Sequence, residues 1–361
     1  MNRAIDIPRE LSLRMTNMSF VCACMIVLFH ATPAPESGTW MWWLCRTFGR
    51  EGICSMAVPF FFLASGFFVA GHLEGVGEWR HEICKRVRTV IIPFFIWLYI
   101  LTAFAFAIWY LKANVFMLKA KGNPLGLPTV ELVLKMMGVH PFEDIGVLWY
   151  LRTLFMFVVA LPVFGWLSRH WRVSLPVLFA VLCVFEVMYV RYSSWNFYYF
   201  FDRVISIRGA FYFLAGVALR VYFLRSLGVI RGQRGFLPIV VAIAGFAVAA
   251  GLGLNGWSCV ACIIRAVMAP IAILGLFAIM PTRNLPPVLS GTAFPMYLMH
   301  NMFLSVSSLM LVALGVRDLC GVGMLGIFIF RTLFAIGASL VVITLLRRVS
   351  VRWSSVIFGG R

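Results

Sequence analysis

Apolar stretches long enough to cross a lipid bilayer recur along almost the whole chain, with polar gaps between them. An α-helix needs about 20 predominantly apolar residues to span the hydrocarbon core. Because backbone groups in lipid must be hydrogen-bonded within their own segment, the pattern predicts an all-α, polytopic membrane helix bundle of about ten transmembrane helices. The predicted spans are about 16–33, 53–71, 89–111, 146–167, 174–190, 208–224, 236–254, 260–280, 291–314 and 321–346.

The composition agrees with a membrane protein. Hydrophobic residues make up 62% of the 361 and charged residues 12%, and the mean hydropathy is +0.95. Soluble domains carry about 25% charged residues. The longest polar gap, 112–145, is too short for a separate soluble domain. We therefore expect one integral membrane domain over residues 1–361, multi-pass in the cell membrane.

The net charge of +18 is dispersed over the gaps between spans. This distribution is typical of topology signals and of contact with anionic headgroups, so the expected partner is the lipid bilayer and not nucleic acid. Ten spans leave both termini on one side, which holds 18 of the 31 Lys and Arg residues, against 10 on the opposite side. The positive-inside rule then predicts that both termini are cytoplasmic.

His30 closes the apolar stretch Met18–Ala31. An ionisable group within a span costs free energy, which makes it a candidate functional group. The alternative is a neutral histidine that hydrogen-bonds between helices or lies at the interface. The predicted topology places His30 near the outer end of its span. On an ideal helix, Thr16, Ser19 and Ala23 lie within about 40° of its direction, so His30 shares a small, polar face.

A basic cluster, Lys85-Arg86-Val87-Arg88, precedes the span at 89–111 on the predicted cytoplasmic side. It is either a topology signal or a clamp for the phosphates of a cytoplasmic donor, which arginine binds through charge-assisted hydrogen bonds.

Other polar groups lie inside predicted spans. Tyr297 and His300 are three residues apart and share a helix face. The remaining charged groups are functional or pair among themselves; they are Arg152, Glu186, Arg265 and Arg331.

No metal-ligand spacing, nucleophile elbow or phosphate-binding glycine loop is found, and no metal site is predicted. The C-x-x-C of Cys259 and Cys262 lacks the second Cys or His pair that a zinc site needs.

Five stretches in order resemble the integral membrane acyltransferase 3 family. They are V-L-F-H at 27–30, F-F-F-L-A-S-G-F at 60–67, K-R-V-R-T-V-I-I-P at 85–93, L-W-Y-L-R at 148–152 and Y-L-M-H at 297–300. The resemblance implies transfer of an acyl group, commonly acetyl from acetyl-CoA or another acyl-CoA, to a hydroxyl of an extracytoplasmic or lipid-linked carbohydrate. It matches His30 to the histidine of the family's first span, and Arg86 and Arg88 to its basic motif.

The first motif departs from the family pattern. Many members carry a basic residue eleven positions before the histidine and often an acid three residues earlier, whereas Ser19 and Thr16 stand there. Arg14 is near but points about 160° away from His30 on an ideal helix. Either Arg14 substitutes through a bent helix start, or another arginine such as Arg152 takes the role.

The resulting hypothesis places the donor's nucleotide on Lys85, Arg86 and Arg88, with the pantetheine arm running through the bundle. The candidate catalytic residues are His30, Arg152, Tyr297 and His300. His30 would act as general base, because an imidazole pKa of about 6.5 suits that work, or would carry the acyl group covalently. Arg152 or Tyr297 would stabilise the oxyanion.

Two other functions remain open from the residues alone. A transporter of a sugar or small anion would use the same intramembrane His and Arg groups, although transporters usually contain an internal repeat and none is visible. A non-catalytic membrane sensor or scaffold would need the polar residues only for pairing.

Overall fold

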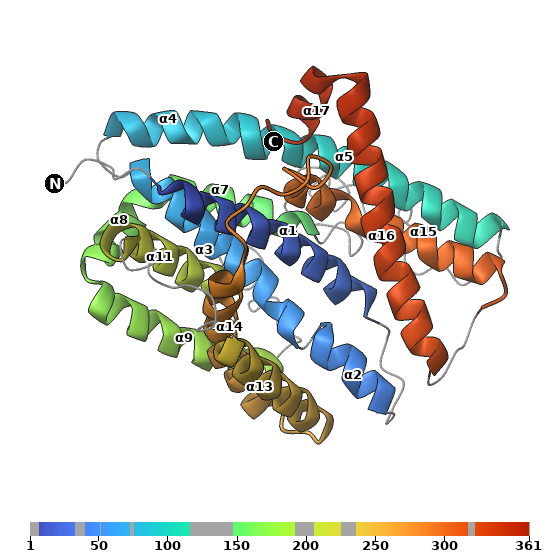
Figure 1. Ribbon diagram of the computed structural model, residues 1–361, viewed down its shortest axis with the longest axis horizontal. Helices are drawn as coiled ribbons and strands as arrows, with labels where there is room; N and C mark the ends of the chain where they lie inside the picture. Colours follow the sequence, from blue (N-terminus) through green and yellow to red (C-terminus); the bar gives the residue numbers. More distant parts are fainter. Residues whose placement is uncertain are drawn as a thin grey trace.

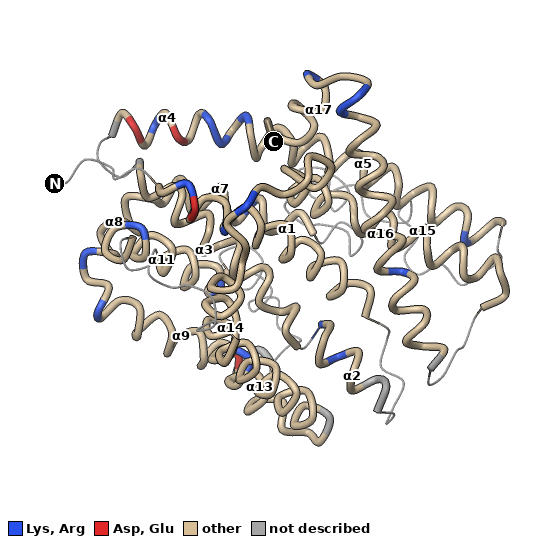
Figure 2. Tube along the Cα trace, in the orientation of Figure 1, with Lys and Arg blue, Asp and Glu red and all other residues tan. Residues whose placement is uncertain are grey.

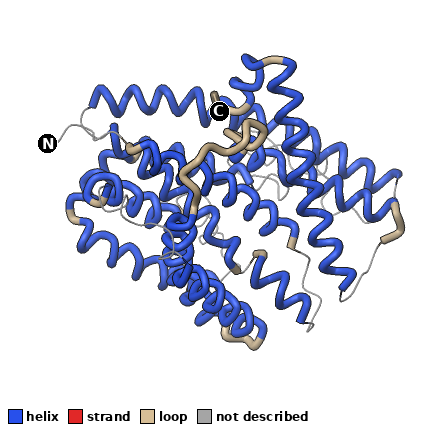
Figure 3. Tube along the Cα trace, in the orientation of Figure 1, coloured by secondary structure: helices blue, strands red, loops and turns tan. Residues whose placement is uncertain are grey.

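The computed structural model describes residues 7–32, 40–50, 52–72, 76–115, 147–191, 206–224, 236–316 and 322–360. Helices dominate this part of the chain, and it contains no strand (Figure 3). The helices are α1 (Arg9–Ala31), α2 (Trp40–Phe48), α3 (Ala57–Val69), α4 (Val76–Arg86), α5 (Ile92–Tyr110), α7 (Trp149–Val159), α8 (Leu161–Arg169), α9 (Trp171–Arg191), α11 (Ile207–Tyr222), α13 (Phe236–Leu254), α14 (Ser258–Ile279), α15 (Ala293–Ala313), α16 (Val322–Val349) and α17 (Val351–Ile357) (Figure 1).

The prediction of an all-α polytopic membrane bundle is confirmed. Within the described residues, eight helices are long and apolar enough to cross a membrane, or nine if one bent pair counts as a single span. The predicted span at 208–224 accounts for much of the difference from ten, because α11 has only 16 residues. At 1.5 Å per residue it covers about 24 Å, less than the hydrocarbon core of about 30 Å.

The span predicted at 146–167 is two helices, α7 and α8, with an angle of 67° between them. The break falls at Ala160, and Pro162 lies in the first turn of α8. A proline has no N–H, and its ring clashes with the carbonyl four residues earlier, so the helix cannot continue straight through this point.

The polar residues 72–88 were expected to connect two spans, but most of them are helical. α4, a π-helical turn (Val87–Ile91), α5 and a second π-helical turn (Leu111–Val115) form one helical run over Gly77–Val115, 39 residues long. Such a run measures about 58 Å, so α4 extends beyond the hydrocarbon core. Pro93 follows the π turn, which gives the proline ring room without ending the helix. Figure 2 shows charges of both signs along α4.

α1 lies at the centre of the bundle and packs against α3, α15 and α16 (Figure 1). Its Asn17 is buried, and Nδ2 donates to the carbonyl oxygens of Pro281 (2.8 Å) and Arg283 (3.0 Å). These bonds hold the segment before α15 against α1, and residues 285–291 of that segment line the cavity described in the next section. The helix α2 lies in the gap between the predicted spans 16–33 and 53–71.

Two glycines let α3 and α11 approach to backbone contact. A Cβ added to Gly216 would lie 2.0 Å from the Leu63 carbonyl oxygen, and one added to Gly66 would lie 2.1 Å from the Phe213 carbonyl oxygen. Small residues at such crossings are typical of membrane helices, where close van der Waals packing drives association.

We expect Gly216→Ala to destabilise the protein by about 1–3 kcal/mol, because the methyl group meets rigid backbone. Thermal unfolding of the purified protein in detergent measures the change. Gly337→Ala is the matched control, since a Cβ there has nothing within 4 Å. Equal melting temperatures for Gly216→Ala and the wild type would contradict the close packing of α3 and α11.

Candidate active site

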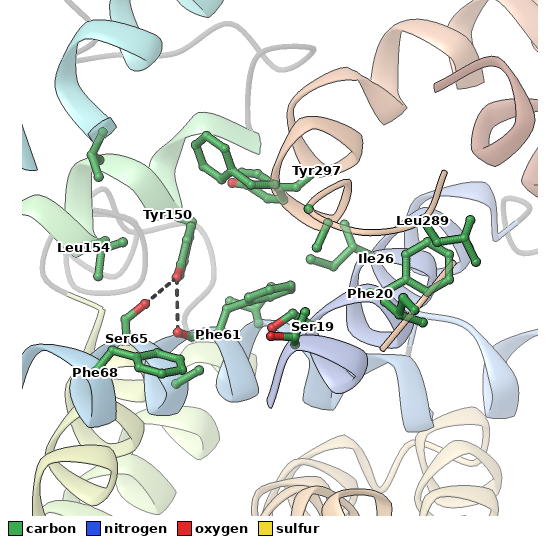
Figure 4. Close-up of a pocket in the computed structure, with 18 of the residues that line it drawn as sticks. Ser19, Phe20, Ile26, Phe61, Ser65, Phe68, Tyr150, Leu154, Leu289 and Tyr297 are labelled. Atoms are coloured by element: carbon green, nitrogen blue, oxygen red, sulfur yellow. Dashed lines mark hydrogen bonds between the residues drawn. The ribbon is translucent and has the colours of Figure 1, made fainter. Parts of the chain in front are cut away.

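A cavity of about 270 Å³ lies between α1, α3, α7 and α15, and residues 285–291 close one side. Its walls are mostly apolar, and Figure 4 shows the aromatic rings of Phe61, Phe68, Tyr150 and Tyr297 around it. The Tyr150 hydroxyl donates to the Phe61 carbonyl oxygen (3.2 Å) and lies 3.1 Å from Ser65 Oγ. The cavity is thus an apolar chamber with a few fixed polar groups, which is typical of ligand sites.

Arg86 brings a positive charge to this first cavity. Its Nε donates to Glu82 Oε1 at 2.7 Å, and Lys85 Nζ lies 3.6 Å from Glu82 Oε2. The Glu82 side chain is fully buried, whereas half of the Lys85 side chain is exposed. A buried carboxylate is stable only when it is paired, so Glu82 fixes the direction of Arg86. Arg88 is exposed and does not line the cavity.

Sequence reasoning missed Glu82, although a signal was present. It lies three and four residues before Lys85 and Arg86. On a helix this spacing places an acid beside both bases.

Tyr297 and His300 extend inward from the first cavity. Tyr297 lines the first cavity from α15, and its hydroxyl donates to the Val147 carbonyl oxygen. His300 is completely buried, with Nδ1 at 2.6 Å from the Tyr297 carbonyl oxygen and Nε2 without a hydrogen-bond partner. Because Nδ1 faces an acceptor, the neutral ring carries its proton there and presents Nε2 as an acceptor.

A second, polar cavity of about 170 Å³ lies on the other side of His300 from Tyr297. His30 is exposed and lines it, and its ring centroid is 4.9 Å from that of His300. The other described residues around the cavity come from three further segments of the chain: Lys112, Asn301, Leu304, Ser305, Ser308 and Arg331.

Aromatic rings connect the two cavities. The centroid distances are 5.7 Å from Tyr150 to Tyr297, 6.0 Å from Tyr297 to His300 and 4.9 Å from His300 to His30. Along α1, α15 and the run containing α5, residues of the first cavity precede those of the second. The cavities therefore occupy opposite halves of the bundle.

The structure thus brings His30, Tyr297 and His300 into a row of neighbouring rings and places Arg86 in the wall of the first cavity. Arg152 is half-buried on α7 and lines neither cavity. Arg14 is buried, with its guanidinium 5.7 Å from the Phe277 ring centroid, so it also lies away from both.

The small polar residues of α1 lie partly in the first cavity. Thr16 and Ser19 line it, and their hydroxyls donate to carbonyls of their own helix at 3.0 and 2.7 Å.

Three of the charged residues singled out within spans have hydrogen-bond or close polar contacts in the described residues. Glu186 accepts a hydrogen bond from Arg208 Nε at 2.9 Å, and Arg265 Nη2 lies 2.9 Å from Cys262 Sγ. Arg331 Nη1 donates to the Ala31 carbonyl oxygen at 3.4 Å. Glu186, Arg265 and Arg331 therefore each have at least one partner within the described residues.

Within the described residues, no group of three or more His, Cys, Asp or Glu side chains is arranged to hold a metal ion. Cys259 and Cys262 are both free thiols.

Comparison with known proteins identifies one family. No curated protein and no solved structure matches the chain. The model of the acyltransferase 3 family, described as an acyltransferase domain, matches residues 15–348, which is nearly the whole chain. This match covers both cavities and the helices between them, and the chain therefore belongs to the acyltransferase 3 family of membrane O-acyltransferases.

Proposed function

We propose that this acyltransferase moves an acyl group, most simply acetyl, from acetyl-CoA to a hydroxyl of an extracytoplasmic or lipid-linked carbohydrate. The observation that carries the proposal is the line of rings that joins a cavity bearing Arg86 to a cavity bearing His30. The enzyme would work in the cell membrane with both termini in the cytoplasm. Donor and acceptor would then enter from opposite sides.

The donor site is proposed at the first cavity. Coenzyme A carries phosphates at its nucleotide end and the thioester at the end of a long, thin arm. Arg86, held by Glu82, offers its remaining N–H groups to phosphate, and the exposed Lys85 and Arg88 flank it. The apolar cavity suits the arm, and its inner wall at Tyr297 leads toward His300.

The transfer itself is proposed beside His30. The imidazole takes the proton of the acceptor hydroxyl, and the hydroxyl oxygen attacks the carbonyl carbon of the thioester. The tetrahedral intermediate collapses, the C–S bond breaks, and the thiolate receives the proton from the imidazolium. In the alternative route the acyl group passes first to His30 and then to the acceptor.

Tyr297 is the better placed of the two candidates for the oxyanion, since it lines the donor cavity and Arg152 does not. To serve, its hydroxyl would exchange the Val147 carbonyl for the oxyanion. His300 presents an unpartnered Nε2 between Tyr297 and His30, so it can accept a hydrogen bond from a group that arrives with the substrates. No observation in the described residues specifically favours transport or a scaffold role.

Replacing His30 with Ala should reduce acyl transfer by about 10²- to 10⁴-fold, the usual contribution of a general base. Incorporation of radiolabelled acetyl from acetyl-CoA into membrane glycans measures the rate, and mass spectrometry should find the matching acetyl increment. His170→Ala is the control, since His170 is exposed beyond α8. Full activity in a correctly inserted His30→Ala protein would refute the assignment of His30.

Replacing Arg86 with Gln should raise the KM for acetyl-CoA by about 10- to 100-fold with a smaller change in kcat, because charge-assisted hydrogen bonds to phosphate are lost. Glu82→Gln should act in the same direction by releasing Arg86. Arg80→Gln, an exposed change on the same helix, provides the control. An unchanged KM in Arg86→Gln would leave the basic cluster only a role in topology.

A further inference from the structure

The second cavity contains two cations and several neutral polar groups. Lys112 follows α5, and Arg331 lies within the candidate span Gly323–Val349 of α16. Asn301, Ser305 and Ser308 come from one side of α15. In the part of the chain that the structure describes, no Asp or Glu lines this cavity or forms an ion pair with either cation.

Arg331 is only partly satisfied by the protein. Its Nη1 donates to the last carbonyl of α1, at Ala31, beside His30. Its Nε is buried and has no hydrogen-bond partner. A charged group within a span is costly unless a counter-charge or water matches it, so a cation that faces a polar cavity favours an anion there.

We infer that the second cavity binds the acceptor through a negatively charged group, a phosphate or a carboxylate, held by Arg331 and Lys112. Asn301 and Ser305 can add hydrogen bonds to the same group or to the sugar, and Ser308 can do so if its hydroxyl leaves the Leu304 carbonyl oxygen, to which it donates at 3.0 Å. Since His30 lines the same cavity, an anion held there brings a neighbouring hydroxyl of the acceptor to the imidazole. The acceptor class is therefore an acidic or phosphorylated carbohydrate rather than a neutral one. This inference rests on the proposed function of His30.

A purely structural role for Arg331 makes a different prediction. An arginine at the C-terminus of a helix stabilises its last carbonyls, and Arg331 does this for α1 through Nη1. If this were its only role, replacing Arg331 would weaken the fold and would reduce transfer to all acceptors equally. It gives Lys112 and the serine hydroxyls of α15 no part.

The test measures ligand binding to the purified protein in nanodiscs by thermal shift at constant ionic strength. The probes are glucose, glucuronate, glucose 1-phosphate and inorganic phosphate. We expect the anionic sugars to stabilise the wild type and glucose not to. Stronger stabilisation by glucuronate indicates a site for a carboxylate on the sugar, and stronger stabilisation by glucose 1-phosphate indicates a site for a phosphate. Inorganic phosphate shows whether the anion binds without a sugar attached.

Arg331→Gln should weaken binding of the anionic sugars by about 10- to 100-fold, the loss expected for charge-assisted hydrogen bonds. Arg331→Lys should restore part of it, and Lys112→Gln provides a second test if Arg331→Gln does not fold. Arg352→Gln, exposed on α17, should behave like the wild type. Equal stabilisation by glucose and by the anionic sugars, or anion binding that survives both Arg331→Gln and Lys112→Gln, would overturn the inference.

The binding assay also separates this inference from the proposed function. If the wild type binds the anionic sugars, Arg331→Gln does not, and the wild type transfers no acyl group to any acceptor, the anion site is supported and the proposed function is refuted. Acyl transfer to neutral sugars at full rate in Arg331→Gln would support the function and refute the anion site.

Discussion

A charged side chain that is buried in the protein or in the bilayer needs a counter-charge, a hydrogen-bond partner or water, and this requirement shapes both ends of the bundle. At one end the buried Glu82 pairs with Arg86 and fixes its guanidinium at the wall of the first cavity. At the other end Arg331 reaches the end of α1 and leaves its Nε unmatched beside the second cavity. In the first arrangement the two charges match each other within the protein. In the second, the charge of Arg331 is not matched by an acidic residue in the described part of the protein and favours a bound anion.

The central helices extend from one cavity to the other. α1, α15 and the run through α5 all proceed from the first cavity to the second, so a side chain's place along the helix decides which cavity it lines. The run from Arg86 to Lys112 covers roughly 39 Å at the usual helical rise. A long, thin donor could therefore present its reactive end far from the charges that bind its phosphates, and the bilayer need not separate donor from acceptor.

Much of this arrangement could be predicted from sequence. Apolar length predicted the helical membrane bundle, because this local signal recurs along the chain, and five distinct motifs in order predicted the family. The same signals did not give the break at Ala160 or the long run through Pro93. A proline breaks a helix in one case and follows a π turn in the other, and the packing around it decides.

The candidate site was predicted less completely. His30 and His300 were each singled out, but their contact depends on how α1 packs against α15, which no spacing encodes. Glu82 was overlooked because its burial is a tertiary property, although its spacing from Arg86 was visible. The sequence left open whether Arg331 is functional or pairs with another charge; its contact with the backbone beside His30 depends on how α16 packs against α1.

The proposed mechanism requires the acyl end of the donor to reach His30 and His300 from the cavity that holds Arg86. A photoreactive acyl-CoA with a diazirine in its acyl chain tests this directly, with the labelled peptides of the purified enzyme identified by mass spectrometry. Labels should appear on α1 near His30 and on α15 near His300, and excess unlabelled acetyl-CoA should remove them. Labels confined to α4 or to helix faces outside the two cavities would contradict it.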